Sequence, residues 1–168
     1  MGHIYLETEQ FYIRQWSIND IEELHEIMSD SQVYTYASSM PWTIEHTANY
    51  IKFMLDKNFK TLELFHGACV LKSNNTIIGL TGLNPYLLKK HELEWKFGVS
   101  FWGNGYATEI GKAIIKEAFK STDIELIYGM VNPQNKASMR VMEKIGMILE
   151  VVRICFIKVK ENKALKMQ

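Results

Sequence analysis

The spacing of apolar residues divides the chain into short strands and amphipathic helices. Apolar positions recur every three or four residues in four segments, which begin near Asp20 and Thr43 and cover about 105–119 and 135–145. Branched and aromatic residues gather in short runs between them, which predict strands at 11–16, 64–71, 76–83, 91–99 and 127–131, with a final hairpin at 147–160. The predicted order is β-α-α-β-β-β-α-β-α-β-β.

Turn and capping residues set the predicted ends of these elements. Asn19 or Asp20 is expected to cap the first helix, Thr43 the second, and Gly146 is expected to end the last helix in a left-handed conformation. The segment 73–75 predicts a hairpin turn, 85–90 a polar loop, and 161–168 a polar tail. Strands interleaved with helices indicate an α/β domain whose mixed sheet carries helices on its faces.

Composition narrows the class of protein. The 168 residues suit one domain, 1–168, and 19 basic against 19 acidic side chains give no net field for nucleic acid or an anionic membrane. No apolar run is long enough to span a bilayer, and the first residues lack a signal-peptide pattern. Cys69 and Cys155 lie in apolar runs and are expected to be reduced core residues. We therefore expect a cytoplasmic protein that binds neither nucleic acid nor membrane.

A glycine-containing junction joins the strand 91–99 to the helix 105–119: Trp-Gly-Asn-Gly-Tyr-Ala-Thr-Glu at 102–109. The first N–H groups of a helix have no intrahelical partners and lie at the positive end of its dipole, so such a junction can bind a phosphate. An ordinary tight turn into a helix is the alternative.

Two nucleotide-binding patterns fit this junction poorly. Five residues separate Gly105 from Gly111-Lys112, and Ala113 follows, whereas the Walker pattern needs four and then a hydroxyl. Thr108 stands where the dinucleotide fingerprint needs its third glycine.

The segment 102–109 instead resembles the acetyl-CoA pyrophosphate loop of the GNAT-type N-acetyltransferases. It is most similar to the branch that contains the ribosomal-protein alanine N-acetyltransferases. The segments 132–138 and 142–147 resemble that family's Asn/Ser helix, and 8–20 resembles the opening of the branch. The resemblance therefore covers most of the chain.

The resemblance implies a fold and a cosubstrate. The fold is a mostly antiparallel sheet with helices on both faces, splayed between its fourth strand (91–99) and its fifth (127–131), with the pantetheine arm of acetyl-CoA in the gap. The pyrophosphate would be held by the backbone amides of Gly103, Asn104, Gly105, Tyr106, Ala107 and Thr108. Asn135 would hold the pantetheine amides or the phosphate arm, and a backbone N–H between Phe97 and Val99 would stabilise the oxyanion.

Acetyl transfer to an amine also needs a base. Glu92 and Glu94 are two residues apart, so their side chains lie on the same face of the strand. Glu92 falls where the resembled branch has its acidic residue, whereas Glu94 stands where that branch has a glycine. A carboxylate beside apolar groups has its pKa raised toward the working pH, which suits Glu92 as a general base. The alternative is that both are surface carboxylates paired with lysines of the same stretch.

The leaving thiolate needs a proton. Much of the superfamily uses a tyrosine where this chain has Met142, which cannot donate. Ser138 lies one helical turn after Asn135, and the resemblance to the branch implies that its hydroxyl gives this proton. The alternatives are that the hydroxyl bonds its own backbone, or that solvent supplies the proton.

The leading hypothesis is an N-acetyltransferase that acts by direct transfer in a ternary complex. The acceptor would be a protein N-terminal α-amine or a small-molecule amine, contacted by the aromatic loop 34–42, whose aromatics could equally be core residues. A catalytically idle acyl-CoA-binding module and an unrelated phosphate-binding domain are the alternatives. The histidines show no metal-ligand spacing, so no metal is expected, and a monomer and a homodimer are both compatible with the sequence.

Overall fold

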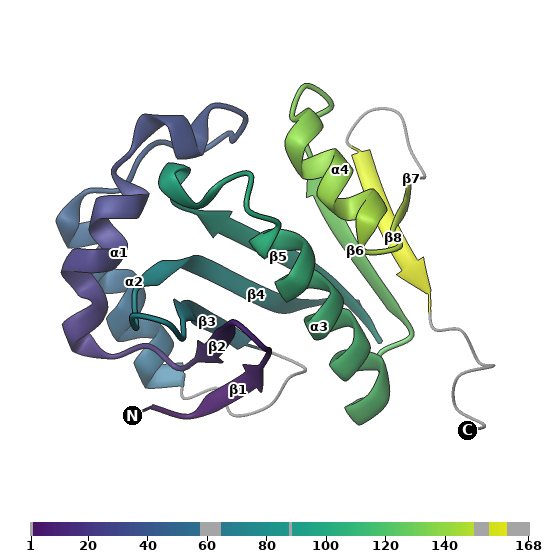
Figure 1. Cartoon of the computed structure of the whole chain (residues 1–168), viewed down its shortest axis with the longest axis horizontal. Helices are drawn as coiled ribbons and strands as arrows, with labels where there is room; N and C mark the ends of the chain where they lie inside the picture. The colour runs from purple at the N-terminus through teal and green to yellow at the C-terminus, as the bar shows by residue number, and fades with distance from the viewer. Residues whose placement is uncertain (1, 58–64, 88, 150–154, 161–168) are drawn as a thin grey trace.

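A computed structural model describes residues 2–57, 65–87, 89–149 and 155–160, and the strands of these ranges form one sheet. The sheet order is β1-β2-β3-β4-β5-β6-β8-β7 (Figure 1). The strands are β1 (Ile4–Glu7), β2 (Phe11–Arg14), β3 (Phe65–Leu71), β4 (Ile77–Leu87), β5 (Lys90–Phe97), β6 (Leu126–Val131), β7 (Ile148–Leu149) and β8 (Cys155–Lys160). The helices are α1 (Ile21–Met28), α2 (Ile44–Lys57), α3 (Tyr106–Ser121) and α4 (Lys136–Lys144), with 3₁₀ turns η1 (Ile18–Asp20), η2 (Ser31–Tyr34) and η3 (Val99–Phe101).

The sheet opens between β5 and β6. Neighbouring strands pair antiparallel except these two, which run parallel and pair only from Lys90 opposite Leu126 to Glu92 opposite Tyr128. Beyond that point the two strands diverge (Figure 1). The mixed, mostly antiparallel sheet and its splay are therefore confirmed.

Helices cover both faces of the sheet. One core cluster joins residues of α3 and α4 to sheet residues such as Leu93 and Phe97, and the other joins α1 and α2 to residues such as Leu80. Because side chains alternate along a strand, the neighbours Glu92, Glu94 and Lys96 face the α1–α2 side. The active-site carboxylates predicted from the sequence thus lie on the opposite face from α3.

Two predictions about the strands are wrong. An additional strand, β1, precedes β2, and its four residues are too few to show a period; it pairs with β2 from Ile4 opposite Arg14. The predicted polar loop 85–90 belongs mostly to a long hairpin, since β4 runs through Pro85 to Leu87 and β5 begins at Lys90. A register shift between Pro85 and Leu87 accommodates the proline.

Capping followed the expected chemistry at two of three sites. The Thr43 hydroxyl accepts the N–H of His46 at 3.1 Å, and Gly146 has a φ of 87°. The first helical segment, however, is capped by Ser17, which accepts the N–H of Asn19. Asp20, one of the two expected caps, is the N-cap residue of α1, but its side chain makes no capping hydrogen bond to α1 and instead accepts the Ser17 N–H at 2.7 Å.

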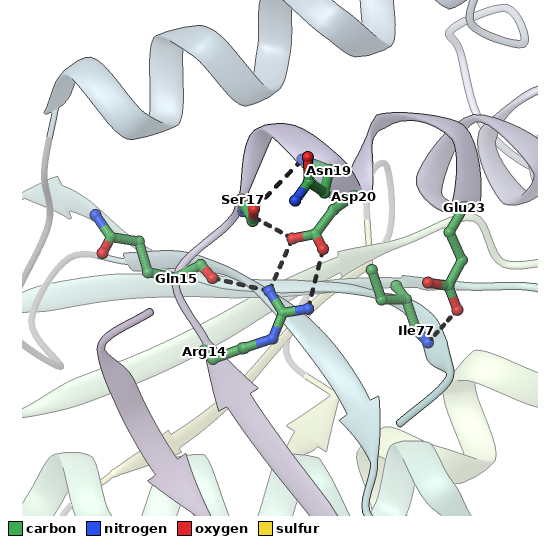
Figure 2. Close-up of polar contacts among 7 residues, drawn as sticks. All are labelled: Arg14, Gln15, Ser17, Asn19, Asp20, Glu23 and Ile77. Atoms are coloured by element: carbon green, nitrogen blue, oxygen red, sulfur yellow. Dashed lines mark hydrogen bonds and ion pairs between the residues drawn. The ribbon is translucent and has the colours of Figure 1, made fainter. Parts of the chain in front are cut away.

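Asp20 also ties α1 to the sheet. Its carboxylate receives both arms of the Arg14 guanidinium, at 2.7 and 3.0 Å, and Arg14 also donates to the Gln15 carbonyl (Figure 2). One turn further on, the Glu23 carboxylate accepts the backbone N–H of Ile77 at 2.6 Å (Figure 2). These contacts hold the α1 layer over β2 and β4.

The remaining predictions concern the two cysteines, the C-terminal tail and membrane spans. Cys69 is a fully buried free thiol whose pKa is raised by burial, whereas the Cys155 side chain and the tail 161–168 lie outside the described part. Within the ranges that the structure covers, no helix has the length and hydrophobicity of a membrane span.

Candidate active site

The glycine junction adopts the strained backbone that its sequence predicts. Gly103 and Gly105 have φ angles of 80° and 81°, and Gly105 is the N-cap of α3. A Cβ added at either glycine would have no atom within 4 Å, so the backbone conformation, and not crowding, demands glycine. The free space leaves this end of α3 accessible to a ligand.

Side chains of the junction brace the loop. The Trp102 indole N–H donates to the Phe97 carbonyl at 2.8 Å, and the Asn104 amide donates to the carbonyls of Phe101 and Trp102. The Tyr106 ring packs edge-on against Phe11, 5.0 Å between centroids. Asn104 and Tyr106 therefore have structural roles for their side chains, and what they can offer a ligand is backbone N–H.

The first turn of α3 offers the helical anion site. The N–H groups of Thr108 and Glu109 already donate to the Gly105 carbonyl, at 3.0 and 3.1 Å. The amides of Tyr106 and Ala107 come earlier in the turn, where an α-helix provides no carbonyl partner. Of the predicted pyrophosphate donors, Thr108 is thus the one whose amide is engaged within the chain.

The open edge of β5 presents backbone to the gap. The Gly98 N–H donates across to the Ile78 carbonyl of β4 at 2.9 Å. Because N–H groups alternate between the two edges of a strand, those of Trp95 and Phe97 point the other way, toward β6, beyond the last β5–β6 pair. Of the residues 97–99, Phe97 is therefore the one whose backbone N–H the geometry favours as the oxyanion donor. The carbonyl of Val99 belongs to the following turn, where it accepts the Trp102 N–H.

Glu92 lies where the two strands part. It is the last β5 residue paired with β6, opposite Tyr128, whose hydroxyl donates to the Glu92 carboxylate at 3.4 Å. Burial raises the pKa of this half-buried carboxyl, the charge of Glu94 raises it further, and the Tyr128 hydrogen bond lowers it. The net effect is that the pKa of the Glu92 carboxyl is raised from its ordinary value.

Tyr128 was not singled out from the sequence. It is buried, its pKa is raised by burial and by Glu92, and its ring meets that of Tyr86 edge-on at 5.1 Å. Its relation to Glu92 depends on the register of two parallel strands 36 residues apart, which no local pattern reveals.

Within the described residues, the structure does not pair Glu92 and Glu94 with Lys89 or Lys96, as the alternative for two surface carboxylates would require. Lys89 pairs with Glu125 at 3.0 Å, and Lys96 lies over the ring of Tyr34 at 5.9 Å from its centroid. Glu92 contacts Tyr128, and Glu94 contacts His66 at 3.2 Å.

Asn135 and Ser138 meet at the start of α4. The Asn135 side-chain oxygen accepts the backbone N–H of Ser138 at 3.0 Å and so caps the helix. Within the described residues the Ser138 hydroxyl forms no hydrogen bond, so it is not tied to its own backbone. Met142 is 3% exposed and packs against Gly129, which confirms a core residue where the superfamily often has tyrosine.

The aromatic loop 34–42 divides between core and surface. Tyr34 is buried, and Trp42 stacks on His46 at 4.6 Å, whereas Tyr36 and Met40 are 43% and 79% exposed. Over the ranges described, no three histidine, cysteine or acidic side chains gather as a metal site.

Comparison with known proteins now decides the family. The sequence model described as the acetyltransferase (GNAT) domain matches residues 10–148, most of the chain. The protein belongs to the GNAT acetyltransferase family. It is accordingly an acetyl-CoA-dependent N-acetyltransferase.

Individual relatives of this GNAT protein agree. The uncharacterized N-acetyltransferase YnaD of Bacillus subtilis is 27% identical over 145 residues, which cover 86% of this chain and 82% of YnaD. A GNAT-family acetyltransferase from Bacillus anthracis superposes with a TM-score of 0.82 at 27% identity, over 94% of this chain and 98% of that one. A spermidine N-acetyltransferase from Vibrio cholerae, solved with CoA and spermine, has a TM-score of 0.77 at 15% identity, over 94% and 98%, and so shares the fold.

Proposed function

We propose that this GNAT protein transfers the acetyl group of acetyl-CoA directly to a primary amine within a ternary complex, with Glu92 as the general base. The observation that carries the proposal is the position of Glu92: a half-buried carboxylate of raised pKa at the point where β5 and β6 part. A base there lies beside the gap into which the family's cosubstrate enters.

The backbone around the gap suits acetyl-CoA. The amides of Gly103 to Ala107 would hold the pyrophosphate at the accessible end of α3, and Thr108 would contribute once its amide turned from Gly105. The unpaired N–H groups of Trp95 and Phe97 would pair with the pantetheine arm and the thioester oxygen. The free amide hydrogens of Asn135 would serve the same arm from α4.

The proposed step balances its protons. Glu92 takes one proton from the acceptor ammonium, and the neutral nitrogen bonds to the carbonyl carbon while the Phe97 N–H stabilises the oxyanion. The C–S bond then breaks, the nitrogen releases its second proton to solvent, and the thiolate gains a proton either directly from solvent or from the Ser138 hydroxyl, which solvent then reprotonates. A carboxyl with a raised pKa becomes a base only as pH rises through that pKa, so turnover should rise with pH over the same interval.

The acceptor is proposed by class. The junction motif at 102–109 resembles that of the ribosomal-protein alanine N-acetyltransferases, which favours a protein N-terminal α-amine in the cytoplasm. A small-molecule amine is the other candidate, because the fold is shared with the spermidine enzyme above. Exposed Tyr36 and Met40 would contact either acceptor. Acetylation as a monomer or as a homodimer is compatible with this site.

One observation favours a second candidate. Met142 occupies the core where many superfamily members have a tyrosine that can donate a proton. A module that binds acetyl-CoA without turnover would tolerate this residue.

The two candidates separate in an assay of CoA release with acetyl-CoA and a panel of peptides with free N-termini, polyamines and aminoglycosides. We expect turnover with at least one amine, and a loss of about 10²–10⁴-fold in kcat for Glu92→Gln. Glu117→Gln, which alters a partly exposed carboxylate paired with Lys120, should keep full activity. Binding of acetyl-CoA without any acetylation would support the idle module, and full activity of Glu92→Gln would remove Glu92 as the base.

A further inference from the structure

A histidine reaches across one strand of the sheet to a carboxylate beside the proposed base. His66 in β3 and Glu94 in β5 flank β4, and the β4 residue between them in both ladders is Gly82. The imidazole lies over Gly82, where an added Cβ would come within 2.9 Å of the ring atoms. The ring Nδ1 reaches Glu94 Oε1 at 3.2 Å, so the missing side chain of Gly82 makes this contact possible.

The imidazole is held on its other sides as well. Its Nε2 contacts the side-chain oxygen of Asn84 in β4, and the Tyr50 hydroxyl of α2 lies 3.4 Å from Nδ1. The His66 side chain is 13% exposed, whereas that of Glu94 is 37% exposed. The His66 ring is thus held in place and contacts the Glu94 carboxylate, which remains partly open to solvent. This arrangement differs from two mobile charges on a surface.

The same contacts lead to Glu92. Glu92 and Glu94 are two residues apart on one face of β5, about 7 Å along the strand. The charge of Glu94 contributes to the raised pKa of Glu92. Asn84, which contacts His66, lies directly opposite Glu92 in the β4–β5 ladder. Each ring nitrogen of His66 therefore contacts a residue that neighbours the proposed base, Glu94 on β5 and Asn84 on β4.

We propose that His66 is a positioning residue of this acetyltransferase: lying across Gly82, it fixes the Glu94 carboxylate and so sets how strongly Glu94 acts on Glu92. The inference rests on the proposed role of Glu92. A proton on Nδ1 lets the ring donate to Glu94 and offset part of its negative charge, while a proton on Nε2 lets the ring donate to the Asn84 oxygen. Loss of the ring should raise the pKa of Glu92, and loss of the Glu94 charge should lower it.

Other titratable and charged groups near the two carboxylates stay constant in the comparison. Tyr128 of β6 donates to Glu92 and contacts Tyr86 of β4, the Tyr50 hydroxyl of α2 lies beside His66, and Lys96 of β5 lies over Tyr34 of η2. Because none of these changes between the variants, differences in the titration of Glu92 report on His66 and Glu94.

The test is a titration of the glutamate side-chain ¹³C resonances by NMR in the full-length protein without ligand, with Glu92 and Glu94 assigned from their Gln variants. We expect the midpoint of Glu92 to rise in His66→Gln and to fall in Glu94→Gln, so that the two variants differ by about half a pH unit, the size of a Coulomb interaction over about 7 Å in a water-like medium. The double variant should titrate like Glu94→Gln alone. Gly82→Ala should reproduce His66→Gln, because its Cβ displaces the ring.

His25→Gln is the matched control, since it removes a part-buried imidazole that contacts Thr47 between α1 and α2. It should leave the midpoint of Glu92 unchanged. An unchanged midpoint in both His66→Gln and Gly82→Ala would overturn the proposal, as would a double variant that differs from Glu94→Gln. Two substitutions at different positions keep the test decisive if one of them fails to fold.

Turnover with the most active amine of the panel separates this proposal from the assignment of the base. The acidic limb of kcat/KM should move with the NMR midpoints in His66→Gln and Glu94→Gln. Midpoints that move while Glu92→Gln keeps full activity would support the His66 contact and refute Glu92 as base. Midpoints that stay fixed while Glu92→Gln is inactive would refute the role of His66 alone.

Discussion

At the scale of single residues, the glycines of the junction 102–109 adopt a left-handed backbone conformation that would strain any residue with a Cβ. Gly105 holds a φ of 81° at the N-cap of α3 with open space where a Cβ would stand. Gly146 repeats both features after α4, with a φ of 87° and no atom within 4 Å of an added Cβ. The two positions therefore have the same backbone cost, and only Gly105 lies in the junction 102–109.

Because Gly105 and Gly146 share this backbone conformation, Gly146 is a matched control for a substitution at Gly105. Gly105→Ala and Gly146→Ala should each lower the free energy of unfolding by about 1 kcal/mol, because each places a Cβ in the left-handed region. Only Gly105→Ala should weaken acetyl-CoA binding, by about tenfold, since its Cβ would stand in the path of a phosphate. Urea denaturation and calorimetric titration measure the two effects. Equal affinities for acetyl-CoA in both variants would contradict a phosphate site at this junction.

At the scale of elements, the α1 layer is joined to the sheet by polar contacts as well as by its core. Arg14 at the end of β2 binds Asp20 with side-chain exposures of 15% and 9%, and Asp20 also accepts the Ser17 amide (Figure 2). The pair Lys72–Glu7, by contrast, is 24% and 57% exposed. Burial decides how much each pair contributes, since solvent screens an exposed pair and cannot replace a buried partner.

We expect Asp20→Asn to lower the free energy of unfolding by about 2 kcal/mol, between the values for exposed and fully buried pairs. Glu7→Gln should cost less than about 1 kcal/mol. Denaturant titrations of the two variants at neutral pH provide the comparison. A loss for Asp20→Asn no larger than that for Glu7→Gln would show that the Arg14–Asp20 pair does not anchor α1.

The elements also show what sequence can and cannot predict. Helical spacing and capping residues such as Thr43 are local, so the four helices appeared where their patterns placed them. β1 was missed because four residues show no reliable period, and β4 was cut short because Pro85 resembles a loop residue until its register shift is seen. Both errors concern strands whose identity depends on a partner elsewhere in the chain.

At the scale of the whole molecule, the difference between local sequence patterns and long-range strand pairing also explains which site residues the sequence could propose and which it could not. Glu92 and the 102–109 junction each lie in a local stretch that resembles the family pattern, so the sequence alone could propose them as site residues. Tyr128 and His66 reach Glu92 and Glu94 only through the pairing of β3, β4, β5 and β6. Their roles are properties of the sheet register, and Gly82 shows no signal in the sequence until a ring lies across it.

The gap between β5 and β6, together with the 102–109 junction, is where the molecule is proposed to hold acetyl-CoA, and a thermal-shift titration tests this most directly. At a hundredfold excess over Kd, acetyl-CoA should stabilise the protein by about 2.7 kcal/mol, which for a domain of this size is about 5–11 °C in Tm. ATP at the same concentration should leave Tm unchanged. A protein whose Tm responds to neither acetyl-CoA nor CoA would contradict the account and would reduce the junction to a turn between β5 and α3.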